Sequence, residues 1–168
     1  MSPSIKTKRL VLRPYGAEDG DRVAELLGNF EVTRWLAKVP HPFTHADLRL
    51  MNDDGSSRWP DLAAITLNSE VIGGISSGGH LGYWLDPAYW GQGIASEAAR
   101  AMVDYFFETT DQEMLESGYF EGNLGSERIL SKLGFVETER YPFFNKALNR
   151  KAPNVDMLLT RDAWTARK

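Results

Sequence analysis

The stretch from Leu81 to Glu97 constrains the fold more than any other part of the chain, because it passes from strand to loop to helix. Residues 81–85 read as a strand, and Gly91 and Gly93 stand where the following helix begins. Glycine lets the backbone approach a ligand closely, and the first turn of a helix leaves N–H groups unpaired. Together with the helix dipole, this arrangement predicts a site for a phosphate or diphosphate. A glycine-rich turn without a ligand is the alternative.

The loop matches neither of two common phosphate-binding motifs. No Lys-Ser or Lys-Thr follows the glycines, as a phosphate loop requires, and Ser96 stands where a dinucleotide-binding fingerprint has its third glycine. The helix after the loop is amphipathic. Its apolar stripe consists of Ala95, Ala98, Ala99, Met102 and Phe106, and its polar face consists of Glu97, Arg100, Asp104 and Glu108.

Hydrophobic periodicity divides the rest of the chain into strands and helices. We expect further strands at 8–13, 62–67, 70–75, 115–120, 135–140 and 155–160, and further helices at 17–28, 31–37, 44–50 and 123–133. Asn68-Ser69 predicts a two-residue hairpin turn, and Thr44 with Asp47 resembles a capping box. Gly134 suits the left-handed position after a helix. The first half is hairpin-like, so we expect one domain over residues 1–168 with a mixed sheet and helices on both faces.

Composition excludes several classes of protein. The chain has 168 residues, 42% of them hydrophobic, which is enough for one packed core. The absence of Cys excludes disulfide scaffolds, thiolate zinc sites and cysteine nucleophiles. The net charge of −4 provides no general attraction to nucleic acid or to an anionic membrane. No apolar run approaches the ~18 residues of a membrane span, and the start carries no signal core, so a cytoplasmic location is expected.

A second constellation follows the glycine loop at a distance. It consists of the segment 117–123 (Ser-Gly-Tyr-Phe-Glu-Gly-Asn), then Ser126, then the segment 132–135 (Lys-Leu-Gly-Phe). Together with the Tyr-Trp-Gly-x-Gly-x-Ala-x-Glu-Ala pattern at 89–98, it resembles the GNAT superfamily of acyl-CoA-dependent N-acetyltransferases. Within that superfamily it is most similar to the ribosomal-protein N-terminal acetyltransferase-like branch. The resemblance extends from Thr7 to Trp164.

The resemblance implies an α+β fold. Its central sheet would be mixed, mainly antiparallel and of about six or seven strands, with a splay between the strands at 81–85 and 115–120. It also implies acetyl-CoA as cosubstrate and no metal. The loop N–H groups would hold the diphosphate, and the end of the preceding strand would pair with the pantetheine arm. The cofactor-binding residues implied in this way are Trp84, Leu85, Gly91, Gln92, Gly93, Ile94, Ala95, Ser96 and Asn123, the last of which could equally cap its helix.

Three positions depart from the family pattern. Trp90 stands where the loop motif has Gln or Arg, Gly118 where many members have a general-base Glu, and Leu130 where many have a Tyr that protonates the thiolate. The resemblance leaves Ser126 for the acid role. The alternative is that the Ser126 side chain only forms hydrogen bonds with backbone groups in the first turn of its own helix.

The missing Glu bears on the acceptor. At pH 7, deprotonating an α-amine of pKa ~8 costs about 1.4 kcal/mol, whereas a lysine amine of pKa ~10.4 costs about 4.6 kcal/mol. A site without a dedicated Glu therefore suits the less basic amine better. Water chains to Glu121, Glu139 or His80 could still relay the proton, and we take Ser126 and Glu139 as the catalytic candidates.

The early helical region is where the resemblance places the acceptor pocket. Trp35, His41 and Phe43 are its candidate residues, although core packing would explain the two aromatic rings equally well. His41 and His45 lack a third ligand, so no metal site is expected. We expect a small-molecule or peptide amine as acceptor and a monomer or homodimer. The alternative, from another class, is a non-catalytic acyl-CoA-binding sensor or scaffold.

Overall fold

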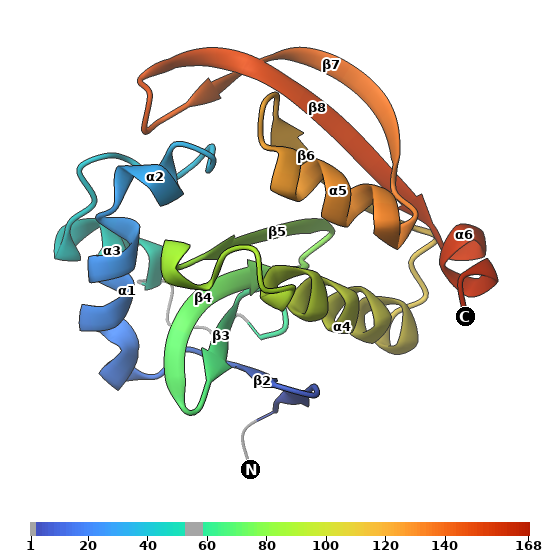
Figure 1. The fold of residues 1–168 in the computed structure, drawn as a ribbon, viewed down its shortest axis with the longest axis horizontal. Helices are drawn as coiled ribbons and strands as arrows, with labels where there is room; N and C mark the ends of the chain where they lie inside the picture. Colours follow the sequence, from blue (N-terminus) through green and yellow to red (C-terminus); the bar gives the residue numbers. More distant parts are fainter. Residues whose placement is uncertain (1–2, 53–58) are drawn as a thin grey trace.

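Strands and helices follow one another in short groups along the chain in this computed structural model, which describes residues 3–52 and 59–168 (Figure 1). The strands are β1 (Ile5–Lys6), β2 (Leu10–Arg13), β3 (Ala63–Leu67), β4 (Glu70–Ser76), β5 (His80–Leu85), β6 (Met114–Phe120), β7 (Val136–Asn145) and β8 (Arg150–Thr160). The α-helices are α1 (Gly20–Leu27), α2 (Phe30–Thr33), α3 (His45–Asn52), α4 (Ile94–Thr109), α5 (Leu124–Leu133) and α6 (Arg161–Ala166). Two 3₁₀ turns cover Ala17–Asp19 and Pro87–Tyr89.

The strands form one sheet in the order β1-β2-β3-β4-β5-β6-β8-β7. All neighbours are antiparallel except β5 and β6, which are parallel. The expected mixed, mainly antiparallel sheet is therefore confirmed. It has eight strands rather than six or seven, because the two residues of β1 pair with β2 and are too few to show a periodic pattern.

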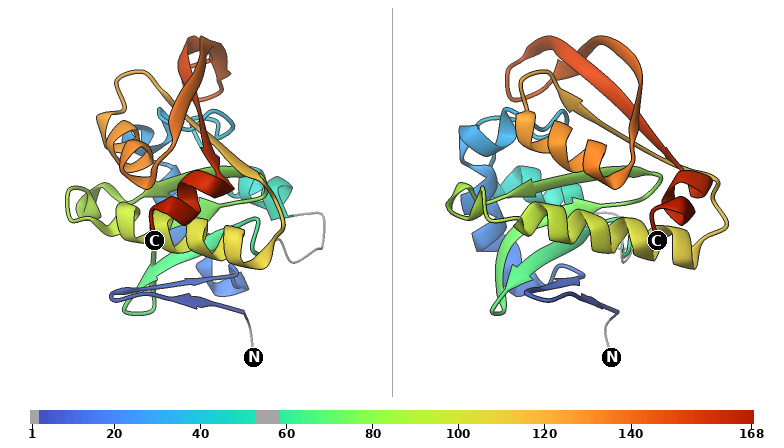
Figure 2. Two further views of the ribbon diagram at one scale, coloured as in Figure 1. Left: turned by 90° about the vertical axis from the view of Figure 1, so that its right-hand side faces the viewer. Right: turned by 45° about the vertical axis from the view of Figure 1, so that its right-hand side comes forward.

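Helices cover both faces of the sheet, as expected. On one face α4 and α5 pack on the main core, in which Ala98, Met102 and Leu130 are fully buried. On the other face α1 places Val23 and Leu27 against β3 and β4. Figure 2 shows α4 beside the half of the sheet formed by β1–β5 and α5 beside the half formed by β6–β8. The two halves meet at β5 and β6.

Three local predictions are confirmed. Asn68 and Ser69 both have positive φ, as a tight type I′ hairpin turn requires. The capping box forms at the start of α3, since the Thr44 N–H donates to Asp47 Oδ2 at 2.8 Å and the Asp47 N–H donates to Thr44 Oγ1 at 3.3 Å. Gly134 ends α5 at φ +98°, and the following N–H donates back to the Leu130 carbonyl at 3.0 Å.

Other elements differ from the expected ones for physical reasons. The helix expected at 31–37 ends at Thr33, because the Trp35 and Leu36 N–H groups bond three residues back in a tighter turn. Strands β7 and β8 extend far beyond 135–140 and 155–160, and β7 is exposed along most of its length, so it carries no alternation to detect. The tip of this hairpin is fastened to the loop after α2, where Asn145 Nδ2 donates to the Arg34 carbonyl at 2.8 Å.

Helix α6 has no counterpart among the expected elements. Thr160 caps it by accepting from the Ala163 N–H at 3.2 Å, and Trp164 stacks on Phe107 in the core. Across residues 3–52 and 59–168, no helix combines the length and apolar character that crossing a membrane requires.

Candidate active site

Strands β5 and β6 separate soon after they meet, which opens the sheet. Their pairing is limited to His80 with Glu116 and Leu81 with Ser117. At the point of divergence the buried Ser117 hydroxyl donates to the Leu81 carbonyl at 2.7 Å. The expected splay is thereby confirmed, and a cavity of about 1470 Å³ occupies it.

The glycine loop forms one end of this cavity. Gly91 and Gly93 have φ of +74° and +73°, a conformation that L side chains rarely adopt. Space does not require glycine at Gly91, since an added Cβ would meet nothing within 4 Å. Helix α4 begins after Gly93, and its ladder starts with the Glu97 N–H donating to the Gly93 carbonyl at 3.0 Å. The N–H groups of residues 94–96 precede that ladder and are available to an anion.

Arg9, which directly precedes β2, lies beside this loop. Its Nη1 donates to the Gln92 carbonyl at 2.9 Å, and its Nη2 lies 3.6 Å from where a Cβ on Gly93 would be. Its Nε donates to Glu97 Oε2 at 2.7 Å. Burial would raise the pKa of Glu97, but hydrogen bonds from Thr7 and Arg9 lower it overall. No local sequence pattern could have predicted this contact, because Arg9 is more than 80 residues away from the loop in sequence.

The backbone of β5 presents one edge to the opening. The Asp86 N–H donates to the Ile72 carbonyl at 2.7 Å, so the N–H of Asp86 points to β4. Because successive residues alternate, Trp84 also bonds towards β4, whereas Tyr83 and Leu85 turn their backbone groups towards the opening. Trp84 and Leu85, the two predicted residues on this strand, therefore differ in the direction of their backbone groups, and only those of Leu85 face the gap.

Trp90 fastens the loop to the end of β5. Its indole Nε1 donates to the Leu85 carbonyl at 2.9 Å, while the residue as a whole is 45% exposed. The carbonyl of Leu85 is thus already used, and its N–H is the group that remains directed at the cavity. Trp90 itself provides no positive charge here, whereas Arg9 does.

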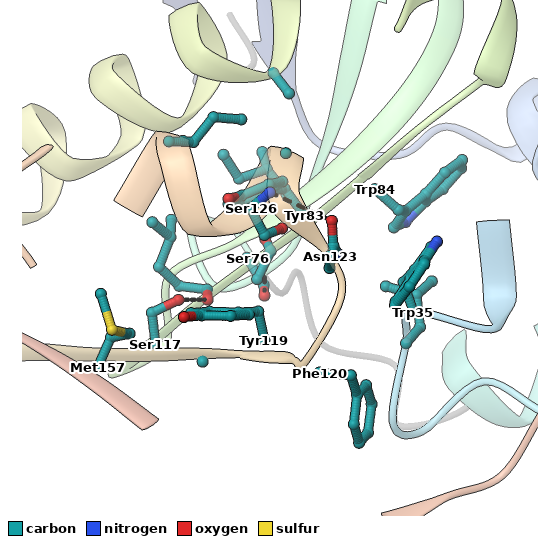
Figure 3. A pocket seen from close by; sticks show the side chains of 18 of the residues that line it. Trp35, Ser76, Tyr83, Trp84, Ser117, Tyr119, Phe120, Asn123, Ser126 and Met157 are labelled. Atoms are coloured by element: carbon teal, nitrogen blue, oxygen red, sulfur yellow. Dashed lines mark hydrogen bonds between the residues drawn. The ribbon is translucent and has the colours of Figure 1, made fainter. Parts of the chain in front are cut away.

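The start of α5 forms the wall opposite the loop. Asn123 Oδ1 accepts from the Ser126 N–H at 3.3 Å, so Asn123 caps the helix. Ser126, Tyr83 and Asn123 are grouped together in Figure 3. The Tyr83 hydroxyl oxygen is buried without a hydrogen bond of normal geometry, and burial raises the pKa of Tyr83 to about 12, which contact with Ser126 partly offsets. Tyr83 therefore stays a hydroxyl at neutral pH.

The cavity brings most of the predicted site residues together. Those that line it are Trp35, Trp84, Leu85, Gly91, Gly93, Ile94, Ala95, Ser96, Asn123 and Ser126. The others lie elsewhere: Gln92 bonds the Ala88 carbonyl through its side chain, and His41 is exposed against the ring of Phe30. Phe43 is buried in the cluster around α1, and Glu139 is exposed on β7.

We call one face of β6 and β8 the far face, namely the face that is turned away from α4 and α5. Its residues include Glu116, Gly118, Asn154 and Asp156, and it borders the same cavity. His80 shares this face because it pairs with Glu116. His80 is exposed overall, but desolvation of its ring lowers its pKa below 6.5, although Glu116 and Asp156 act in the opposite direction. Sequence analysis did not find Asp156, since only strand pairing brings it here.

Over residues 3–52 and 59–168, no group of three or more His, Asp or Glu side chains is placed to hold a metal ion. His45 instead has its Nε2 at 3.0 Å from Asp21 Oδ1, on the outside of α1.

Comparisons with known proteins agree with this geometry. A family model described as "Acetyltransferase (GNAT) domain" matches residues 9–136. The chain is 26% identical over 162 residues to "Uncharacterized N-acetyltransferase p20" of Bacillus licheniformis, covering 88% of this chain and 90% of that protein. A 66-residue stretch is 42% identical to "Probable N-acetyltransferase YjcK" of Bacillus subtilis, covering 39% of this chain and 36% of that protein.

A solved structure extends the likeness to the whole fold. RimL, a ribosomal L7/L12 alpha-N-protein acetyltransferase in complex with coenzyme A, superposes with a TM-score of 0.77 at 17% identity, over 96% of this chain and 99% of that one. This likeness shows that the two chains share a fold. The family match, which spans most of the chain, shows that this protein belongs to the GNAT acetyltransferases, and it is an N-acetyltransferase.

Proposed function

We propose that this enzyme transfers the acetyl group of acetyl-CoA to a primary amine of a small molecule or peptide, by direct attack in a ternary complex. The observation that carries the proposal is the opening between β5 and β6, with the bare start of α4 at one end and Ser126 at the other. An opened sheet with one unpaired strand edge suits an extended, amide-containing arm.

The wall around the opening suits an anionic cosubstrate. The N–H groups of residues 94–96 and the positive end of the α4 dipole favour a diphosphate. Arg9 adds a cation beside the loop, and Arg128 and Lys132 line the cavity from α5, one turn apart. The protein carries a net charge of −4 overall, so this concentration of cations is local.

The reaction needs a neutral amine, an oxyanion donor and a proton for the leaving sulfur. The amine loses a proton to solvent, its nitrogen attacks the thioester carbon, and the C–N bond forms while a further proton leaves. The C–S bond then breaks, and the thiolate takes up one proton. We assign the oxyanion contact to the Leu85 N–H, because it faces the opening and belongs to a rigid strand.

Ser126 is the proposed proton donor to the thiolate. It lines the cavity at the start of α5, its backbone N–H is already satisfied by Asn123, and the Tyr83 hydroxyl lies next to it. Because Tyr83 remains protonated well above neutral pH, it can return a proton to Ser126 or hold the Ser126 hydroxyl in place. Leu130, fully buried in the core, has no part in this step.

The proposal is tested by measuring release of free coenzyme A thiol. The chain contains no Cys, so a thiol reagent reports the product directly in the presence of the enzyme. Purified enzyme is mixed with acetyl-CoA and a panel of primary amines, among them an alanyl peptide, Nα-acetyl-lysine amide and spermidine. We expect amine-dependent thiol release and a mass increase of one acetyl group on the amine.

Binding measured in parallel separates the outcomes. Acetyl-CoA that raises the melting temperature without thiol release from any amine would contradict the enzyme proposal and favour the sensor alternative. The absence of both effects would remove the cofactor site as well. A ligand at 100 times its Kd stabilises a protein by ~2.7 kcal/mol, which a melting experiment detects readily.

A further inference from the structure

The far face places a carboxylate where the family's usual glutamate is missing. Gly118 and Asp156 are paired across β6 and β8, so their side-chain positions emerge side by side. The next residues along, Ser117 and Met157, are buried towards the core under α4 and α5. Asp156 therefore approaches the opening from the side opposite to Ser126.

Gly118 leaves this carboxylate uncovered. A Cβ at Gly118 would lie 3.3 Å from Asp156 Oδ1, 3.8 Å from Asn154 Oδ1 and 3.0 Å from the Val155 carbonyl. A larger residue at position 118 would therefore contact the Asp156 carboxylate and the backbone of β8. Both Gly118 and Asp156 line the cavity, so the carboxylate is accessible from it.

Two neutral donors hold Asp156 in place. The Tyr141 hydroxyl donates to Asp156 Oδ2 at 2.9 Å, and Asn154 Nδ2 donates to Asp156 Oδ1 at 2.9 Å. These bonds fix the rotamer without neutralising the charge. Among the ion pairs formed by residues 3–48 and 59–168, none includes Asp156. A carboxylate held by neutral donors at a cavity wall is complementary to a cation.

The charged groups around Asp156 strengthen this preference. Glu116 shares the face of Asp156 and lines the cavity, whereas Glu139, the partner of Asp156 across β7 and β8, lies outside the cavity. His80, whose pKa is lowered by desolvation, contributes no full charge at neutral pH, and Lys38 is the cation that acts on His80 from the loop after α2. Carboxylates therefore outnumber cations on this side of the opening, in contrast to the wall near Arg9.

We propose that Asp156 binds the ammonium group of the acceptor and delivers its nitrogen to the opening, so that the enzyme selects amines that are cationic in solution. The proposal rests on the acetyl transfer described above. Asp156, positioned by Tyr141 and Asn154, thereby supplies from β8 the carboxylate that Gly118 does not supply from β6. Proton loss from the bound ammonium then takes place beside His80 and the open end of the cavity.

The test is Asp156→Asn, which removes the charge and keeps the shape. We expect kcat/KM for a cationic amine from the panel to fall about thirtyfold, as for loss of a charge-assisted hydrogen bond. For 2,2,2-trifluoroethylamine, which is mainly uncharged at pH 7.5, the fall should stay below threefold. The KM for acetyl-CoA should not change. Glu137→Gln, an exposed carboxylate on β7 that bonds Arg140, is the matched control.

Two results would overturn the inference. One is wild-type kcat/KM for cationic amines in Asp156→Asn, with turnover intact. The other is an equal loss for charged and uncharged amines, which would indicate a structural role. If the wild type acetylates no amine, the proposed reaction fails, but the ammonium site can still be tested. For that test, n-butylammonium is titrated against the coenzyme A-loaded protein. If the amide NMR signals of Gly118 and residue 156 shift in the wild type but not in Asp156→Asn, the ammonium site is supported. If they do not shift in the wild type, the inference is contradicted.

Discussion

The two sides of the opening are built in different ways. The wall that we propose for the cofactor consists mainly of backbone, namely the loop at 91–93, the first turn of α4 and the edge of β5, with Arg9 beside it. The far face consists of side chains from three strands, with Asp156 at its centre. A site made of backbone N–H groups binds the same chemical group as long as the backbone keeps its conformation. A side-chain site can change its ligand by a single substitution, so we expect the far face to be the more easily altered of the two.

Loss of the proposed proton donor should have the largest effect. Ser126→Ala should lower kcat about a hundredfold, the low end for a general acid, and leave the Kd for acetyl-CoA within twofold. Steady-state thiol release and calorimetry measure the two quantities. Ser131→Ala, on the exposed side of α5, is the control. Unchanged turnover in Ser126→Ala would leave this residue with a purely structural role at the helix start.

Strain in the loop should have the next largest effect. Gly93→Val forces a β-branched residue to φ +73°, and a strain of about 1–3 kcal/mol, if binding requires the strained loop, corresponds to coenzyme A binding that is about five- to 150-fold weaker. Gly93→Ala should fall between Val and wild type. Gly20→Ala, at ordinary helical φ in α1, is the control for general stability. Calorimetry measures the Kd for coenzyme A in each variant. Wild-type affinity in Gly93→Val would show that this loop does not hold the diphosphate.

Removing the cation beside the loop should have a smaller, salt-dependent effect. Arg9→Gln should weaken coenzyme A binding about two- to fivefold at low ionic strength, and the difference should shrink in high salt because Arg9 is exposed. Arg100→Gln, on the polar side of α4, should change nothing. An Arg9→Gln effect that is equally large at high salt would point to the lost Glu97 contact rather than to the ligand's charge.

The smallest effect is a pH dependence that originates on the far face. The folded protein lowers the pKa of His80, so protonation is harder in the folded than in the unfolded state. This contribution to stability is complete above the unfolded pKa of about 6.5 and decreases as the pH falls through it. His80→Gln should therefore reduce the drop in melting temperature between pH 7.5 and 5.5. A steeper drop in the variant would reverse the assigned sign.

The same contrast explains how much the sequence could predict. The loop, the helix after it and the capping of α5 depend on neighbours within a few residues, so Gly93, Asn123 and Gly134 were found from local patterns. The position of Asp156 beside Gly118 depends on the register of β6 and β8, which no local pattern encodes.

Long-range contacts also account for the other omissions. Arg9 reaches the loop because β2 lies near the start of α4, which only the assembled sheet determines. Most of β7 was missed because a strand exposed along its length shows no alternation. Phe43 illustrates the converse, because an aromatic residue in the acceptor region is buried against α1.

A crystal structure of the protein with coenzyme A tests the central claim most directly. The account predicts diphosphate oxygens within hydrogen-bonding distance of the N–H groups that precede the α4 ladder, and a pantetheine arm lying along the free edge of β5. Coenzyme A bound at any other surface, with the gap between the two parallel strands empty, would contradict it.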